Sequence, residues 1–190
     1  QPGIPAGVAE NVLTYDYGDL EAVEALLRQH AGRVAAVTLS GSYADMTPED
    51  SFPVALRRLT EEYGVLLVID EIVTGFRLAI GGWHAYYGLK PDLAVFSKGM
   101  ANGMPLSVYL GRRDIMELAQ RGATISSTFS GETLSLAAAC AVLDIYQREP
   151  VIQRLWEAGS RLRVGMVRIF QRYDFPIHIP GLPPCPRFVF

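Results

Sequence analysis

Hydrophobic and polar positions along the first part of the chain follow two alternating patterns. Segments 19–32 and 51–64 carry apolar residues at helical spacing and each ends at a glycine, which predicts two amphipathic helices. Short apolar runs of strand length lie between and after them, at 34–39, 65–69, 93–96 and 107–110. Helices that alternate with buried strands are typical of the α/β class with a mostly parallel sheet.

Two long helices are predicted in the rest of the chain. Segment 132–148 is rich in alanine, which suits close packing, and an apolar stripe after Pro150 predicts a second, amphipathic helix. Residues 187–190 have the character of a strand, but the neighbouring sequence offers it no partner. The first eight residues form only a connector with proline and glycine. We therefore expect an internal segment of a longer polypeptide, or one chain of a split protein.

The composition excludes several functional classes. With 49% hydrophobic residues and a net charge of −3, the chain can bury a core and is not disordered. It has no apolar run of membrane-spanning length, no signal-peptide pattern and no basic cluster, so neither a membrane nor nucleic acid is an expected partner. Cys140 and Cys185 form no disulfide framework, and Cys140 is expected to be a buried thiol in a reducing cytoplasm. The histidines lack metal-ligand spacing, so no metal is expected.

One lysine stands out from the rest of the basic residues. Of the 17 basic residues only Lys90 and Lys98 are lysines, and Lys98 directly follows an apolar run, as Asp70 follows an earlier one. In an open parallel sheet, ligands bind beyond the carboxyl ends of the strands. An acid and a lysine meeting there form either a buried ion pair or a site for pyridoxal 5'-phosphate (PLP). That cofactor needs a lysine amine for a Schiff base and a carboxylate at its ring nitrogen.

Five ordered motifs carry a resemblance to a known family. The chain resembles the class III aminotransferases, and within them the branch of glutamate-1-semialdehyde 2,1-aminomutase and its close relatives. The motifs are DEIVTGFR at 70–77, GLKPD at 88–92, SKG at 97–99, NGMP at 102–105 and TFSGET at 128–133. The likeness extends over nearly the whole chain.

The resemblance implies the fold and the roles of four residues. The fold would be the fold-type I PLP-dependent transferase, with residues 1–148 in the cofactor-binding large domain and 149–190 beginning an α/β small domain. Lys98 would form the Schiff base and Asp70 would pair with the pyridine nitrogen. Ile72 would pack on the cofactor ring, and Thr128 would donate to the cofactor phosphate of the neighbouring subunit in a homodimer. Ile72 has core packing as a compatible role, and Thr128 has an N-cap of the following helix as an alternative.

Several positions depart from the family pattern. Val73 replaces a glutamine, Glu132 replaces a frequent asparagine, and Ser40-Gly41 with the loop through Asp45 replaces a Glu-Pro turn. The family's upstream phosphate loop and its ring-stacking aromatic residue have no counterpart here. Arg77 is either a clamp for a substrate carboxylate or, more in keeping with its surroundings, the partner of a nearby acid.

The function predicted from these features is PLP-dependent amino-group transfer to or from a small amino, keto or aldehyde substrate. The sequence does not separate an aminomutase from an aminotransferase. The alternative is a catalytically incomplete segment that serves as a dimerisation or partner module. A nicotinamide-nucleotide binder is disfavoured because no G-x-G-x-x-G follows a strand. Because Thr128 supplies one neutral donor to a dianion, we expect the chain alone to bind PLP weakly or not at all. Because the strand predicted at 187–190 would have an exposed edge, we also expect the chain to self-associate or to need a complementary chain.

Overall fold

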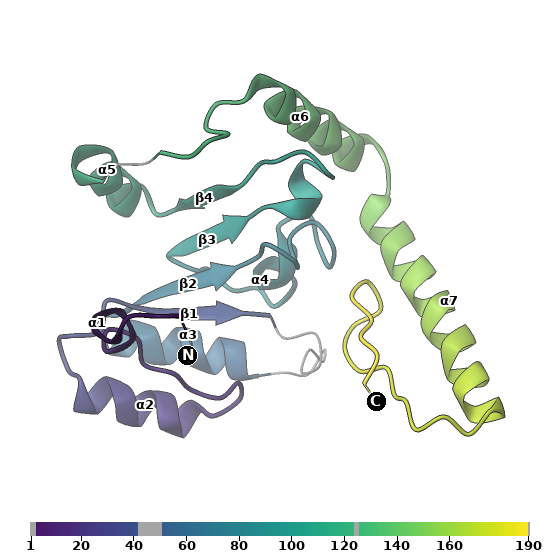
Figure 1. Cartoon of the computed structure of the whole chain (residues 1–190), viewed down its shortest axis with the longest axis horizontal. Helices are drawn as coiled ribbons and strands as arrows, with labels where there is room; N and C mark the ends of the chain where they lie inside the picture. Colours follow the sequence, from purple (N-terminus) through teal and green to yellow (C-terminus); the bar gives the residue numbers. More distant parts are fainter. Residues whose placement is uncertain (1–2, 42–50, 124–125, 190) are drawn as a thin grey trace.

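The computed structural model describes residues 3–41, 51–123 and 126–189, which form a four-stranded sheet with helices around it (Figure 1). The strands are β1 (Ala36–Ser40), β2 (Leu66–Asp70), β3 (Leu93–Phe96) and β4 (Val108–Gly111), in that spatial order. β1, β2 and β3 are parallel, and β4 pairs with β3 in the antiparallel direction. The predicted α/β class and mostly parallel sheet are confirmed.

Seven α-helices are described along the chain. The two predicted near the start are α2 (Leu20–Gln29) and α3 (Phe52–Glu62), and the two predicted near the end are α6 (Thr133–Arg148) and α7 (Val151–Arg172). The Asp19 carboxylate caps α2 by accepting from the Ala22 amide at 2.9 Å, as is usual for aspartate before a helix. The short helices α1 (Ala6–Ala9) and α4 (Gly82–Tyr86), and α5 (Arg113–Gly122), complete the set.

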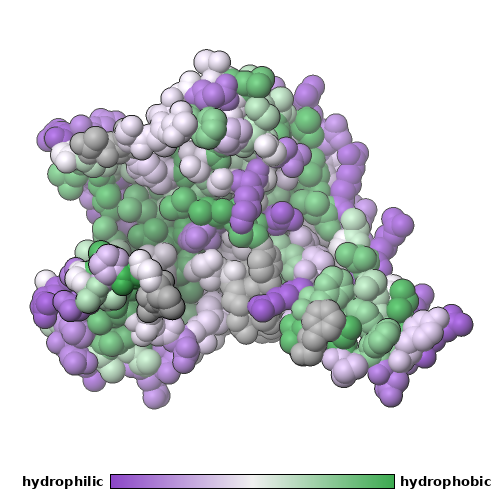
Figure 2. Space-filling model, viewed as in Figure 1, coloured by the Kyte–Doolittle hydropathy of each residue, from purple (hydrophilic) through white to green (hydrophobic). Residues whose placement is uncertain are grey.

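The strand at 108–111 differs from the other strands in direction and from its prediction in burial. It runs antiparallel to β3, because the segment 97–107 contains only a 3₁₀ turn, η1 (Lys98–Met100), and no helix to carry the chain back for a parallel pairing. It is also largely exposed in this chain, with Tyr109 and Leu110 both on the surface. Figure 2 shows hydrophobic surface over the strands between α5 and α1.

The main core lies between the sheet, α2, α3 and the loop that follows α7. Its fully buried members include Leu56, Leu67, Ile69 and Trp83, and Leu182 and Cys185 of the C-terminal loop join them. Burying these side chains is worth about 1.5–3 kcal/mol each for the aliphatic ones. A second cluster is built on Phe76 and Phe96 and packs under α6.

Two sequence predictions about the C-terminal third are wrong. The segment at 187–190 has a partner, because His178 and Val189 exchange both backbone hydrogen bonds in an antiparallel bridge, at 3.1 and 3.0 Å. Cys140 is exposed on α6 and it is Cys185 that is buried, where burial raises its pKa to about 11. None of the helices in the described ranges is long and apolar enough to cross a bilayer.

Candidate active site

Asp70 and Lys98 lie at the same edge of the sheet. Asp70 is the last residue of β2 and is in register with Val95 of the neighbouring parallel strand β3. Lys98 follows shortly after that strand and begins η1. The arrowheads of β1, β2 and β3 point to this edge, where α7 and the C-terminal loop also lie (Figure 1). The predicted convergence at the carboxyl ends is therefore present in the backbone.

Lys98 has an unusual backbone conformation. Its φ is +43°, in the left-handed region that non-glycine residues rarely adopt and that costs on the order of 1–3 kcal/mol. The turn is held by the Asn102 amide, which donates to the Lys98 carbonyl at 2.9 Å, and by the Ser97 hydroxyl, which donates to the Leu106 carbonyl at 2.7 Å. Backbone strain of this kind is concentrated at functional sites.

The side chains of Asp70 and Lys98 do not form a buried ion pair. Lys98 is exposed, and the described residues contain no carboxylate within ion-pair distance of its amine. One oxygen of the half-buried Asp70, Oδ1, accepts from the Ile72 amide at 2.8 Å. This bond orients the carboxylate and leaves Oδ2 without a hydrogen bond to the described residues. The ion-pair alternative is therefore wrong.

The loop after β2 packs closely against the lysine turn. A side chain on Gly99 would begin 3.4 Å from the Gly75 carbonyl oxygen, and one on Gly75 would meet the Phe96 ring at 2.6 Å. Phe76, next in sequence, also has a left-handed φ, of 63°, and its ring contacts Phe96. The lack of a side chain at Gly75 thus makes room for the Phe96 ring, and Gly99 lies in van der Waals contact with the loop.

Residues from two other helices fasten this loop. The Tyr146 hydroxyl of α6 donates to the Phe76 carbonyl at 2.7 Å, and the Trp156 indole of α7 donates to the Leu78 carbonyl at 3.1 Å. Trp156 also stacks on Tyr86 of α4. Because α6 and α7 both hold the loop, its position depends on the C-terminal third of the chain.

Other predicted site residues fall into three groups. Ile72 is half-buried beside Asp70, as either of its predicted roles requires. Arg77 is not the partner of an acid in the described chain, because its Nε donates to the Val73 carbonyl at 2.8 Å and no ion pair forms. The loop through Asp45 that follows Ser40-Gly41 lies outside the described residues.

Thr128 is exposed in the turn that precedes α6, and within the described ranges it forms no hydrogen bond with Asp70, Ile72 or Lys98. It is also not the helix cap. That role belongs to Glu132, whose carboxylate accepts from the amides of Leu134 and Ser135 at 2.8 and 2.7 Å. The Ser135 hydroxyl, which also donates to this carboxylate at 2.6 Å, and these amide bonds lower the pKa of Glu132. The residue that departs from the family's asparagine thus has a structural function here.

The sequence prediction did not find the role of Glu71. Its side chain is fully buried and accepts four hydrogen bonds: from the Thr74 hydroxyl at 2.5 Å, from the amides of Trp83 and His84 at 2.8 and 2.7 Å, and through its contact with His84 Nδ1 at 2.7 Å. Burial opposes its ionisation, but these donors outweigh it and the pKa of Glu71 is lowered. The sequence signal for this role was the pair of adjacent acids. Neighbouring residues of an extended chain face opposite sides, so Asp70 and Glu71 cannot both face the same site.

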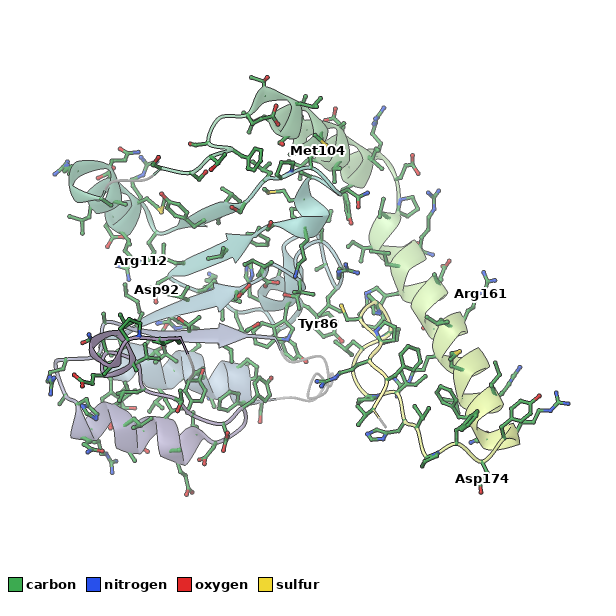
Figure 3. All side chains as sticks on the ribbon, viewed as in Figure 1. Tyr86, Asp92, Met104, Arg112, Arg161 and Asp174 are labelled. Atoms are coloured by element: carbon green, nitrogen blue, oxygen red, sulfur yellow. The ribbon has the colours of Figure 1, made fainter. Side chains whose placement is uncertain are left out.

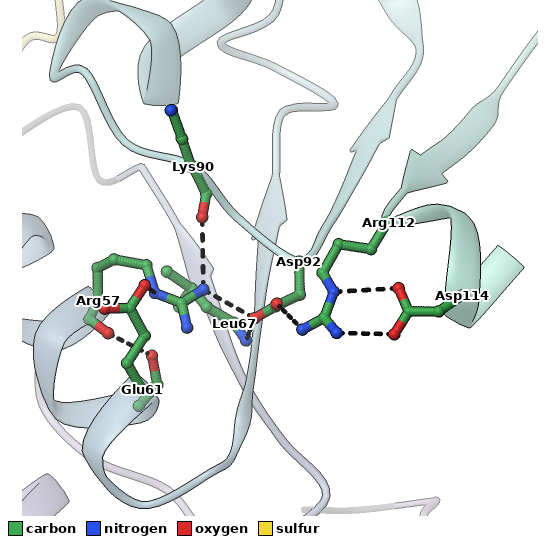
Figure 4. A network of polar contacts seen from close by, with 8 residues as sticks. Arg57, Glu61, Leu67, Lys90, Asp92, Arg112 and Asp114 are labelled. Atoms are coloured by element: carbon green, nitrogen blue, oxygen red, sulfur yellow. Dashed lines mark hydrogen bonds and ion pairs between the residues drawn. The ribbon is translucent and has the colours of Figure 1, made fainter.

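A second buried carboxylate organises the opposite end of the sheet. Asp92, just before β3, accepts from Arg57 at 2.7 Å, from Arg112 at 2.9 Å and from the Leu67 amide at 2.8 Å (Figure 4). Arg112 in turn binds Asp114. Asp92 and Arg112 point toward each other on the side of the sheet away from Tyr86 (Figure 3). This network joins α3, β2, β3 and the start of α5 without touching Asp70 or Lys98.

A hollow of about 770 Å³ lies along β1 and is lined by the N-terminal segment and α2. Neither Asp70 nor Lys98 lines it. The hollow is therefore separate from the candidate site.

The comparisons with known proteins agree with this geometry. The family model for aminotransferase class-III matches residues 9–182. The chain belongs to the class III aminotransferase family. The predicted family is confirmed.

Similar curated relatives carry one function name. The chain is 34% identical over 185 residues to "Glutamate-1-semialdehyde 2,1-aminomutase" of Methanococcoides burtonii, and 38% identical over 185 residues to the protein of that name from Methanothrix thermoacetophila. Each alignment includes 95% of this chain. It spans 44% and 42% of the relatives, so the chain corresponds to less than half their length.

A solved structure with a similar fold is described as the PLP internal aldimine form of the FumI protein from Sphingopyxis sp. MTA144. Its TM-score is 0.88 and it is 29% identical to this chain. The match covers 98% of this chain and 46% of that protein. The family and this fold together confirm the fold-type I class.

Proposed function

We propose that the chain is the cofactor-anchoring part of a PLP-dependent enzyme that transfers an amino group. The observation that carries the proposal is the placement of Asp70 and Lys98 at the carboxyl ends of adjacent parallel strands, with Lys98 held in a strained turn. The family and the names of the relatives support the same activity.

The residues at this edge fit the chemistry of PLP. The cofactor needs an accessible lysine amine and a carboxylate at its ring nitrogen. Lys98 is exposed and not paired with an acid in the described chain, and Asp70 has one oxygen that the described residues leave available. When bound, the protonated ring draws electron density from the substrate's α-carbon.

Each side chain would then have a distinct task. Asp70 holds the proton on the ring nitrogen, and Lys98 binds the cofactor through its amine and, once released, moves the substrate proton. Ile72 supplies an apolar surface for the ring. Thr128 donates to the phosphate of the partner subunit's cofactor in a homodimer, a role for which its exposed position leaves it available.

The substrate would be a small amino compound with a keto or aldehyde counterpart. The names of the relatives favour an aminomutase of the glutamate-1-semialdehyde type, with a class III aminotransferase as the second candidate. Within this proposal residues 1–148 belong to the cofactor-binding large domain and 149–190 begin the small domain, in a cytoplasmic enzyme.

The two lysines provide the experiment. The protein is incubated with PLP, reduced with borohydride and digested, and the modified lysine is located by mass spectrometry. We expect the label on Lys98, its retention in Lys90→Arg and its loss in Lys98→Arg. Lys90 is a suitable control because it is exposed at the opposite end of β3.

Label on Lys90 that persists in Lys98→Arg would refute the assignment of Lys98. If neither lysine is labelled in the homodimer or in the presence of a complementary chain, the result would favour the non-catalytic partner module.

A further inference from the structure

Glu71 is held at more points than its neighbours in the loop. Besides the four contacts to its carboxylate, its amide donates to the Val95 carbonyl of β3 at 2.8 Å, and its carbonyl accepts from the Gly75 amide at 2.8 Å. The residue therefore continues the pairing of β2 with β3 past Asp70 and also closes the turn that begins at Ile72.

His84 extends these contacts toward the lysine. Its ring binds the Glu71 carboxylate on one side, and its centroid lies 6.1 Å from that of Phe96 in an edge-to-face arrangement. Phe96 is the last residue of β3, two positions before Lys98. Glu71 and His84 thus connect the end of β2, which carries Asp70, to the end of β3, which leads to Lys98.

We propose that Glu71 is a positioning residue that fixes Asp70 and Lys98 relative to each other. This inference rests on the proposed function of those two residues. Glu71 does not reach the reacting atoms, because its carboxylate is enclosed by Thr74, Trp83 and His84. Its hydrogen bonds fix the conformation of the backbone at Asp70 and Ile72.

The site accepts only a carboxylate of this length. The Thr74 hydroxyl and the two amides are donors, so an amide in place of the acid would turn its NH₂ toward at least one of them. Gly82 closes the site, since a Cβ there would lie 2.4 Å from Glu71 Oε2. An aspartate, which is shorter by one methylene, would draw its carboxylate back from these donors.

The test compares Glu71→Gln with Asp92→Asn. Both remove the charge of a buried carboxylate that accepts from a backbone amide and from side chains, and both act on the same sheet. Only Glu71 is at the edge with Asp70 and Lys98. Thermal unfolding of the cofactor-free proteins identifies a temperature at which both variants are folded, and all further measurements are made there.

Two readouts separate positioning from general stability. In the cofactor-free protein, we expect Glu71→Gln to accelerate amide hydrogen exchange at 97–102, and Asp92→Asn to leave that segment unchanged. In the PLP-loaded protein, we expect Glu71→Gln to shift the pH midpoint of the cofactor's absorption. Glu71→Gln should also lower kcat by on the order of 10²-fold with a smaller change in KM. Asp92→Asn should change neither the pH midpoint nor kcat.

A milder variant guards against loss of folding. His84→Phe removes the ring donor to Glu71 but keeps an aromatic ring against Phe96, so we expect the same changes with a smaller amplitude. Equal effects of Glu71→Gln and Asp92→Asn on both readouts would overturn the inference, as would unchanged exchange at 97–102 in Glu71→Gln. Failure of the proposed function would appear separately, as absence of label on Lys98 in the unaltered protein, while the exchange measurement still tests the link between the two strand ends.

Discussion

Asp70 and Glu71 are neighbours in sequence but differ in what surrounds them. Glu71 is saturated with donors from its own chain, whereas Asp70 uses one oxygen to bind the Ile72 amide. A carboxylate with an unused oxygen at the end of a strand is available to a ligand, and a saturated one is not. The contrast supports the ligand-facing role proposed for Asp70 and the structural one proposed for Glu71.

The Asp70→Asn variant tests this assignment. An asparagine keeps the shape and the bond to the Ile72 amide, but it cannot hold a proton on the ring nitrogen. We expect PLP to remain bound through Lys98 and turnover to fall by about 10²–10³-fold, as for loss of a positioned group beside developing charge. Steady-state kinetics and the absorption spectrum measure the two effects. Turnover within a few-fold of the unaltered protein would contradict the role of Asp70.

The two ends of the sheet carry different groups of polar residues. The carboxyl ends of β2 and β3 carry Asp70 and Lys98, and the opposite end carries the Asp92 network of Figure 4. That network ties α3 and the Arg112 turn to the strands. Each end thus has a buried carboxylate with several donors, Glu71 at the end with Asp70 and Lys98, and Asp92 at the other.

Removal of the Asp92 charge is expected to destabilise the chain without altering the candidate site. Asp92→Asn removes the buried acid from Arg57 and leaves it only the exposed Glu61, which lowers the free energy of unfolding by about 3 kcal/mol. The donors around Asp92 outweigh its burial and lower its pKa below the usual 3.8. The stabilisation is therefore complete above about pH 4 and is lost as the pH falls through the lower, folded-state pKa.

Urea unfolding of the unaltered protein and of Asp92→Asn at several pH values measures the loss of stability and its pH dependence. We expect the difference between them to be largest near neutral pH and to shrink in acid. Exposed Asp16→Asn serves as the control. A difference that does not change between pH 7 and pH 3 would contradict the account.

The sequence predicted most of these elements because their signals are local. The helices at 20–29 and 52–62 have apolar faces and are followed within three residues by a glycine, and the motif around Lys98 identifies its strand and turn. The direction and exposure of β4 were missed, because pairing direction depends on the length and structure of the connection and burial depends on distant residues. The role of Glu71 was missed for a similar reason: its donors Trp83 and His84 lie far along the chain, and adjacent acids do not reveal which is enclosed.

At the scale of the whole molecule, α6 stands out because much of its apolar surface is exposed. α6 has an apolar sequence, yet within it only Ser135 and Ala139 are buried. Helices that are apolar on most sides are normally covered by other parts of a protein. Leucines on α5 and α6 and the phenylalanine of the turn between them are exposed: Leu118, Phe129, Leu134, Leu136 and Leu143. This surface is close in sequence to Thr128, which the proposed homodimer would place near the partner's cofactor.

We therefore expect the 190-residue chain to associate with itself through α6. Sedimentation velocity should give a species heavier than the 20.9 kDa of one chain, because covering exposed apolar surface of this extent is favourable. Leu134→Glu combined with Leu143→Glu should shift the distribution toward a single chain, since two buried charges would oppose the contact. Leu162→Glu is the matched control: Leu162 is an exposed leucine on α7, outside this surface. A chain that sediments as a monomer at tens of micromolar, or a control that dissociates the complex as well as the double variant does, would show that α6 is not the contact.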